Sequence, residues 1–230
     1  MDDLIGVGLY TPAEAGRLLH VSPGKITRWL RGHQVKGRQY DPLWTPEVDL
    51  GDGKVFLGFR DLMEVRVAAA FIQHGVSPQR VRSAIVQAQE IIAQQHPLST
   101  NRFRTDGREI FLHVIDTDES GAERERLLNL FKRQYEFNGI IEPILKTVDF
   151  GEDGNPFAWW PEGRRFRVVV SPDHAFGAPV DADSHVPTAV LANVAREHGV
   201  KATAAAYDVS ETSVRHALNF EASLEQRLAA

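Results

Sequence analysis

Positively charged side chains gather near the start of this 230-residue sequence, although the chain as a whole is acidic. Between residues 17 and 40 every charged residue is a lysine or an arginine: Arg17, Lys25, Arg28, Arg31, Lys36 and Arg38. The formal net charge is −5, so acidic residues dominate the rest of the chain. A basic patch on an acidic body is typical of a small DNA-binding module on a larger scaffold, and equally of a solvated basic surface.

Two short helices within residues 10–32 are the elements that would position these cations. Thr11 and Glu14 form a capping box around Pro12, and Ser22 followed by Pro23 gives a second helix start after a turn. This spacing predicts a helix-turn-helix whose second helix enters the major groove of DNA, which is about 12 Å wide. The predicted DNA-binding residues are Ser22, Lys25, Thr27, Arg28, Arg31, Lys36 and Arg38.

Small residues are needed where two such helices cross, and Ala15, Gly16 and Val21 suit that place. The segment that follows, residues 33–59, is irregular and rich in turns. Lys36 and Arg38 would lie there on a wing along the DNA backbone. Gly51-Asp52-Gly53, between short apolar stretches, predicts a hairpin.

A second group of arginines lies in the second half of the chain. Arg164, Arg165 and Arg167 follow Trp159 and Trp160 closely. This combination is typical of a surface on which nucleic-acid bases stack, and also of a sheet whose aromatic residues face the core. A third interpretation is a surface that presents arginines to the acidic site of a ribonuclease. The predicted partner-binding residues are Arg164, Arg165, Arg167 and Arg215.

The sequence shows no constellation typical of catalysis. The absence of cysteine excludes disulfides and thiolate metal sites. No two histidines have the i,i+4 spacing of a helical zinc site, and the run from Asp181 to His185 is interpreted as a surface turn. We therefore predict a protein that is not an enzyme, with no catalytic residue, no metal site and no cofactor.

Apolar periodicity predicts a mainly helical α+β fold. The expected elements are helices over 60–75 and from 77 to near 97, strands flanking a turn at 105–108, a helix over roughly 122–135, strands within 140–170 with turns at 151–154 and 161–163, and three helices after Pro187. The predicted domains are a winged helix-turn-helix at 1–97, a central segment of β-hairpins at 98–172, and a helix-turn-helix-like three-helix domain at 173–230. In the last helix, packing for dimerisation or a partner is favoured over DNA contact.

The segment from residue 10 to about residue 95 resembles the DNA-binding domain of the MerR regulator family. The resemblance rests on Tyr10-Thr11 through Val21-Ser22-Pro23, on Phe59-Arg60-Asp61-Leu62, and on His74-Gly75-Val76-Ser77 with Val81-Arg82. It implies a homodimer that binds a palindromic operator. Lys25 and Thr27 depart from the family, which usually has threonine and arginine there. The long dimerisation helix and the cysteine effector sites of the metal sensors are absent.

The C-terminal part resembles the domain of unknown function numbered 433, which occurs in antitoxins. The resembling stretches are Phe176-Gly177-Ala178-Pro179-Val180, Val186-Pro187-Thr188 and residues 202–219. The layout of nearly the whole chain is similar to large VapB-type antitoxins. This resemblance implies that the chain neutralises a VapC-type toxin, a PIN-domain ribonuclease, and represses its own operon.

An acidic start, Met1-Asp2-Asp3-Leu4, is unlike a signal peptide, and no apolar run approaches the roughly 20 residues that span a bilayer. We therefore expect a cytoplasmic protein without a membrane partner. Two other functions stay open. One is a MerR-like regulator that responds to a small effector in place of a toxin, and the other is a protein-interaction scaffold without DNA binding.

Overall fold

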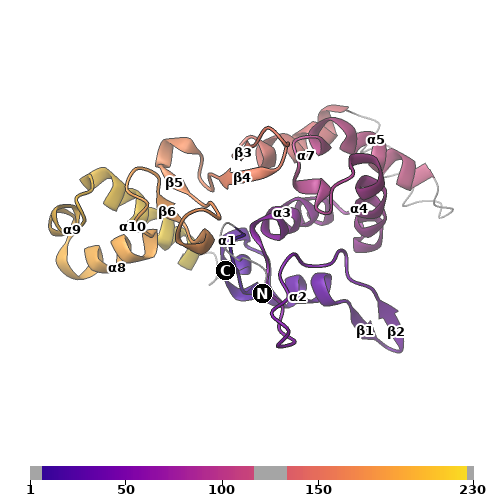
Figure 1. Ribbon diagram of the computed structural model, residues 1–230, viewed down its shortest axis with the longest axis horizontal. Coiled ribbons are helices and arrows are strands. Elements are labelled where there is room, and N and C mark those ends of the chain that lie inside the picture. The colour runs from indigo at the N-terminus through magenta and orange to yellow at the C-terminus, as the bar shows by residue number, and fades with distance from the viewer. Residues whose placement is uncertain (1–6, 117–133, 227–230) are drawn as a thin grey trace.

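The first two helices form where their capping signals predict them. The computed structural model describes residues 7–116 and 134–226 (Figure 1). In it, α1 spans Pro12–Leu19 and α2 spans Pro23–Arg31. The side chain of Thr11 accepts from the backbone of Glu14, whose carboxylate accepts from the backbone of Thr11, so the capping box is complete. The side chain of Ser22 likewise caps α2 by accepting from Lys25 N.

Gly16 allows α1 and the start of α2 to approach closely. A Cβ atom at Gly16 would lie 2.5 Å from the carbonyl oxygen of Val21, nearer than any real side chain would allow. Ala15 and Val21 are buried beside it. The predicted small residues therefore do lie at the crossing, and they leave the opposite face of α2 toward solvent.

A two-stranded hairpin follows in the turn-rich segment. β1, His33–Val35, pairs antiparallel with β2, Arg38–Tyr40, and the two strands project from the helical body (Figure 1). The hairpin predicted at Gly51-Asp52-Gly53 is wrong. The carboxylates of Asp49 and Asp52 fold that loop on itself by accepting from backbone N–H groups two residues on, and Leu57 pairs with Tyr10 instead.

The helices α3, Phe59–Gln73, and α4, Pro78–Ile92, confirm the next two predicted helices. After the short turn η1, Pro97–Ser99, however, the chain forms helix α5, Phe103–Asp116, where strands around a turn at 105–108 were expected. The strand prediction followed the alternation at Ile110 and Leu112. Gly107, taken for a turn residue, instead makes room for the ring of Phe103. A Cβ atom at position 107 would lie 2.8 Å from that ring.

The strands predicted within 140–170 are only partly present. Residues 140–145 belong to helix α7, Gln134–Leu145, which buries Ile140, Ile141 and Leu145 on one side. β3, Val148–Phe150, and β4, Pro156–Trp159, then form a hairpin around the expected turn at 151–154. The helix expected over 122–135 lies mostly outside the described residues.

The C-terminal part confirms the three predicted helices. Before them come η2, Arg164–Phe166, β5, Val168–Val169, η3, Ala175–Gly177, and β6, Val180–Asp181. The helices are α8, Thr188–His198, α9, Val200–Tyr207, and α10, Glu211–Gln226. They form one end of the molecule around a small core of Ala195, Ala204 and Val214 (Figure 1).

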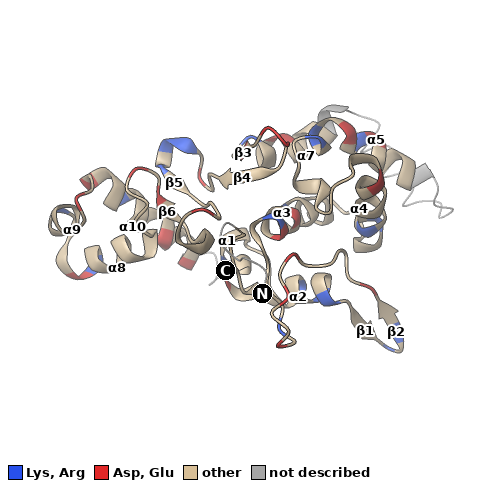
Figure 2. Cartoon of the chain, viewed as in Figure 1, with Lys and Arg blue, Asp and Glu red and all other residues tan. Residues whose placement is uncertain are grey.

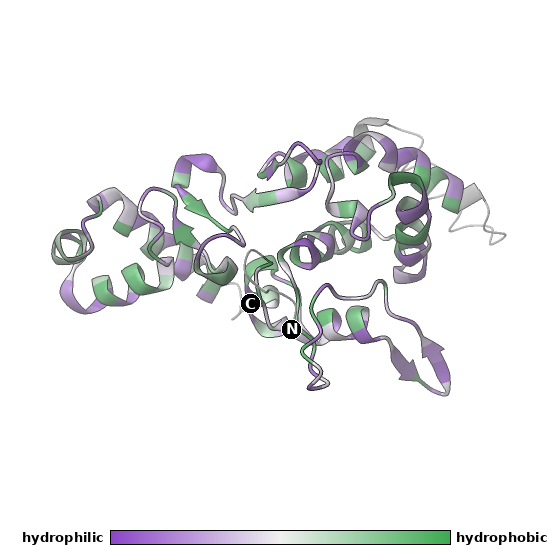
Figure 3. Ribbon diagram, in the orientation of Figure 1, coloured by the Kyte–Doolittle hydropathy of each residue, from purple (hydrophilic) through white to green (hydrophobic). Residues whose placement is uncertain are grey.

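The main core crosses the predicted domain boundaries. Four phenylalanine rings meet at its centre, where Phe71 of α3 contacts Phe103 and Phe111 of α5 and Phe137 of α7, with ring centroids 4.4 to 6.2 Å apart. The same buried cluster continues from Tyr10 to Leu224, and Figure 3 shows the apolar residues gathered between the helices. The fold is thus mainly helical with small antiparallel hairpins, as expected, and the division at 97 and 172 stays a prediction.

Arg66 of α3 joins the helical body to the second hairpin. Its guanidinium donates to the Ile144 carbonyl at 3.0 Å and to the Thr147 hydroxyl at 2.8 Å. It also lies 4.7 Å from the ring centroid of Trp159 in β4, a cation–π distance. Burial lowers the pKa of Arg66 to about 10, which still leaves it charged at neutral pH. Arg66 therefore fastens the second hairpin to α3.

Candidate nucleic-acid interface and arginine loop

Helix α2 has one buried face and one cationic face. Ile26, Trp29 and Leu30 are buried against the body. Lys25, Arg28 and Arg31 are exposed on the other side, where Figure 2 shows a group of basic residues. Within 7–116 and 134–226, no ion pair with an acid is found for any of these three cations. The face is therefore positively charged and open to an anionic partner.

The other predicted residues of the helix take different places. Ser22 is exposed at the N-terminus of α2, where its side chain is used as the cap. Thr27 is half-buried, and its hydroxyl donates to the Pro23 carbonyl at 3.0 Å. Thr27 would therefore offer its methyl group more readily than its hydroxyl to a base edge.

The hairpin carries its cations beside α2. Lys36 and Gly37 have φ angles of 49° and 80°, the left-handed pair that a tight two-residue hairpin turn requires. Lys36 is exposed at this turn, and Arg38 lies 5.3 Å from the ring centroid of Tyr40. Both predicted wing cations are thus on an exposed hairpin that stands away from the body.

A groove lies between α2, the hairpin and α4. Its volume is about 470 Å³, and its lining includes four cations, Lys25, Arg28, Arg38 and Arg82, against one acid, Asp41. Arg82 was not predicted as a contact residue. It donates to the Pro42 carbonyl at 2.8 Å and lies 3.6 Å from Asp41. The sequence places Arg82 beside Val81 near the start of α4. Its position next to α2 depends on how α4 packs, which the sequence pattern does not reveal.

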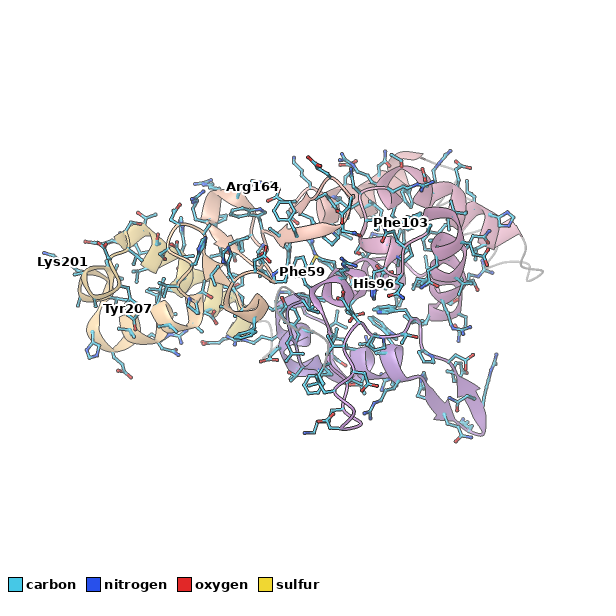
Figure 4. All side chains as sticks on the ribbon, in the orientation of Figure 1. Phe59, His96, Phe103, Arg164, Lys201 and Tyr207 are labelled. Carbon is cyan, nitrogen blue, oxygen red and sulfur yellow. The ribbon has the colours of Figure 1, made fainter. Side chains whose placement is uncertain are left out.

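The second group of arginines lies on the loop between β4 and β5, which we call the arginine loop (residues 164–167; Figure 4 labels Arg164). Arg164 is ion-paired with Asp149, and Arg167 is ion-paired with Asp183. Arg165 is exposed and lies 5.7 Å from the ring centroid of Phe166. Arg165 is therefore the arginine of this loop best placed to contact another molecule.

Arg215, the fourth predicted partner-binding residue, lies on α10. It is ion-paired with Glu211, one turn earlier, at 2.6 Å. The arginine loop reaches the same helix, because the ring of Phe166 packs edge-on against His216 with centroids 5.7 Å apart. The structure therefore places the arginine loop against the helix that carries Arg215, and three of the four predicted arginines are paired with acids.

A group of buried ionisable side chains lies away from both surfaces, around His96 (Figure 4). Asp61 accepts from the Trp44 indole at 2.8 Å and from the backbone N–H groups of Glu47 and Gly58, both at 2.9 Å. Burial raises the pKa of Asp61 to about 6. His96 lies 3.5 Å from Asp61, and burial lowers the pKa of this imidazole.

Glu64, one turn along α3, accepts from the backbone N–H groups of Leu98 at 3.3 Å and Ser99 at 2.9 Å. Burial raises the pKa of Glu64 to about 8. Asp61 and Glu64 have no solvent exposure, so no substrate reaches them. Their role is to fix the segments after the hairpin and after α4 onto α3.

No group of three or more His, Cys, Asp or Glu side chains that could hold a metal ion is found within 7–116 and 134–226. Among the same residues, no helix is both long and apolar enough to cross a membrane.

The chain is similar to a curated protein and to a solved structure. No protein-family model matches the sequence. The chain is 27% identical over 224 residues to a Mycobacterium tuberculosis protein named "Putative antitoxin VapB45", a match that covers 93% of each chain. It also superposes on the crystal structure of Rv2018 from M. tuberculosis with a TM-score of 0.71 and 24% identity, covering 91% of this chain and 96% of the other. The chain is thus similar in sequence along nearly its whole length to a protein named as an antitoxin, and it has the fold of Rv2018.

Proposed function

We propose that this protein is an antitoxin that represses its own operon by binding DNA and neutralises a VapC-type PIN-domain ribonuclease. Similarity to the protein named as antitoxin VapB45 over 93% of the chain supports the antitoxin assignment. The observation that carries the DNA-binding half is the face of α2, where Lys25, Arg28 and Arg31 are exposed and have no acid paired to them in the described chain. The protein would act in the cytoplasm as a homodimer.

In this proposal α2 is the recognition helix of a MerR-like winged helix-turn-helix. Its cations donate to guanine edges in the major groove or to phosphates, while Lys36 and Arg38 on the hairpin follow the backbone. The order α1, α2, hairpin, α3 and α4 supports this arrangement. Phosphate contacts provide affinity without sequence preference. The net charge of −5 does not prevent these contacts, because the cations are concentrated on one side.

The DNA-binding half is tested by titrating a labelled fragment of the promoter upstream of the gene. The double variant Lys25→Ala, Arg28→Ala should bind about 100-fold more weakly, because it cannot form two charge-assisted hydrogen bonds to the DNA. Its plot of log affinity against log salt concentration should also be shallower, by about 0.9 for each phosphate that is no longer neutralised. Fluorescence anisotropy at several salt concentrations measures both quantities.

The matched control is Lys146→Ala, Lys201→Ala, which removes two exposed cations, one after α7 and one on α9, that likewise have no acid paired to them in the described residues. This variant should bind the promoter as the wild type does. Wild-type binding by the Lys25, Arg28 variant would contradict the assigned DNA surface. A wild-type chain that does not bind the promoter at low salt would favour the scaffold alternative.

For the ribonuclease half, Arg165 is the residue we expect to contact the acidic, metal-binding site of the toxin. Arg165→Glu should raise the concentration of this chain that half-inhibits a PIN-domain ribonuclease encoded beside it by at least about tenfold, because the reversed charge meets carboxylates. Cleavage of a labelled RNA measures the inhibition. Lys201→Glu, which reverses the charge of an exposed lysine on α9, is the control. Equal inhibition by Arg165→Glu and the wild type would remove the arginine loop from the interface, and a wild-type chain that does not inhibit would remove the antitoxin function.

A further inference from the structure

An exposed phenylalanine beside an apolar pocket is left unused by the proposed function. Phe176, in η3, has 73% of its surface exposed, the largest fraction among the large hydrophobic side chains of the described residues. It precedes β6 in the sequence and lies in space beside Leu9, just before α1. The backbone N–H of Leu9 donates to the Phe176 carbonyl at 3.0 Å.

The backbone at Phe176 is in a conformation that phenylalanine disfavours. Ala175 and Phe176 have φ angles of 46° and 54°, and Gly177 follows at 88°. Glycine or asparagine would adopt the left-handed region at position 176 at lower cost. The position is held by the Tyr10 hydroxyl, which donates to the Gly177 carbonyl at 2.8 Å. A strained residue that is also exposed indicates that its side chain is needed for a contact.

A pocket of about 350 Å³ adjoins this side chain. Its lining is mostly apolar and comes from α1, the η3 segment, α8 and α10: Leu9, Leu18, Ala178, Pro179, Pro187 and Leu224. Phe176 itself belongs to the lining. Glu14, Arg17 and Glu221 add charges of both signs. The surface therefore has a projecting ring and a hollow side by side.

We propose that Phe176 of one copy of this chain inserts into this pocket on a second copy, and that the second copy does the same in return. A projection next to a hollow is self-complementary, because a twofold axis between them places each projection over the other copy's hollow. The charged residues of the lining already have partners within each copy. Arg17 is ion-paired with Glu221 at 2.6 Å, and the Glu14 carboxylate accepts from the Thr11 backbone at 2.8 Å, so the apolar part of the pocket is what remains for the ring of a second copy.

The inference rests on the homodimer of the proposed function but not on DNA or ribonuclease binding. Sedimentation of the purified full chain over a range of concentrations gives the dimer dissociation constant. We expect a dimer for the wild type and a dissociation constant at least about 100-fold higher for Phe176→Asn, because each dimer loses two buried aromatic anchors. Phe157→Thr, which removes a phenylalanine that is 47% exposed on β4, should leave the dissociation constant within about threefold of wild type.

Stability distinguishes a docking role from a structural one. Urea unfolding is measured at a protein concentration below the wild-type dissociation constant, where the chain is monomeric. Under these conditions Phe176→Asn should have the same urea midpoint as wild type or a higher one, because asparagine tolerates the left-handed backbone. A lower midpoint would show that Phe176 supports its own fold, and would overturn the proposal. A Phe176→Asn chain that dimerises as wild type would overturn the surface and leave the homodimer intact. A wild-type chain that stays monomeric at the highest protein concentration in the sedimentation series would overturn both the docking surface and the homodimer.

Discussion

Replacing Phe71 by alanine should lower the free energy of unfolding by about 4 kcal/mol, because the cost includes the lost burial and the cavity that remains. Phe71 is fully buried and its ring contacts three other phenylalanine rings, the nearest with its centroid 4.4 Å away in Phe111. These rings belong to α3, α5 and α7, which cannot close over a vacated site without moving together. Urea unfolding followed by circular dichroism gives the difference.

Phe157→Ala is the matched control for Phe71→Ala, since it removes the same atoms from a half-exposed position on β4. It should cost no more than about 1 kcal/mol. Equal losses in the two variants would mean that the four rings do not form the centre of the core.

Stability should fall as pH rises from about 5 to about 9, and Glu64→Gln should remove most of that fall. Glu64 has a folded-state pKa near 8 against a usual value of 4.5, so the folded chain binds more protons than the unfolded chain between these two values. By linkage, the contribution of Glu64 is fully present below pH 4.5 and is lost as pH rises through 8. The loss of unfolding free energy is on the order of 5 kcal/mol.

Asp61 adds a smaller loss of the same sign between its usual pKa of 3.8 and its folded value near 6. Urea midpoints at intervals of one pH unit measure the profile. Glu152→Gln, which removes an exposed carboxylate, should keep the wild-type slope. A profile that rises toward pH 9, or a Glu64→Gln variant with the wild-type slope, would mean that the backbone N–H groups of Leu98 and Ser99 keep Glu64 charged.

Local signals in the sequence were enough to predict the helix starts. Thr11 with Glu14, and Ser22 with Pro23, act within one turn of chain, so distant residues do not change their effect. The exposure of Lys25, Arg28 and Arg31 followed from the same source, because the helical period places them opposite Ile26, Trp29 and Leu30. Whether those cations bind DNA stays a prediction.

Features that depend on distant partners were predicted poorly. Helix α5 was mistaken for strands because the burial of Phe103 and Phe111 depends on α3 and α7, which the local alternation around Ile110 does not reveal. The pairing of Arg164 with Asp149 and of Arg167 with Asp183 has the same origin, since 15 and 16 residues separate the partners. Arg82 reaches the groove beside α2 only through the packing of α4.

Arg17 of α1 is ion-paired with Glu221 of α10 at 2.6 Å, and Glu221 also accepts from the Thr188 hydroxyl at 2.6 Å. These contacts join the first helix, α1, to α8 and to the last helix, α10. A fragment cut after residue 172 would uncover the flank of α1 and deprive Tyr10 of its acceptor at Gly177. Such a truncated protein would carry an artificial, adhesive apolar surface beside α1 and α2, and its aggregation or weak binding would report on the damage done by the cut and not on the part removed.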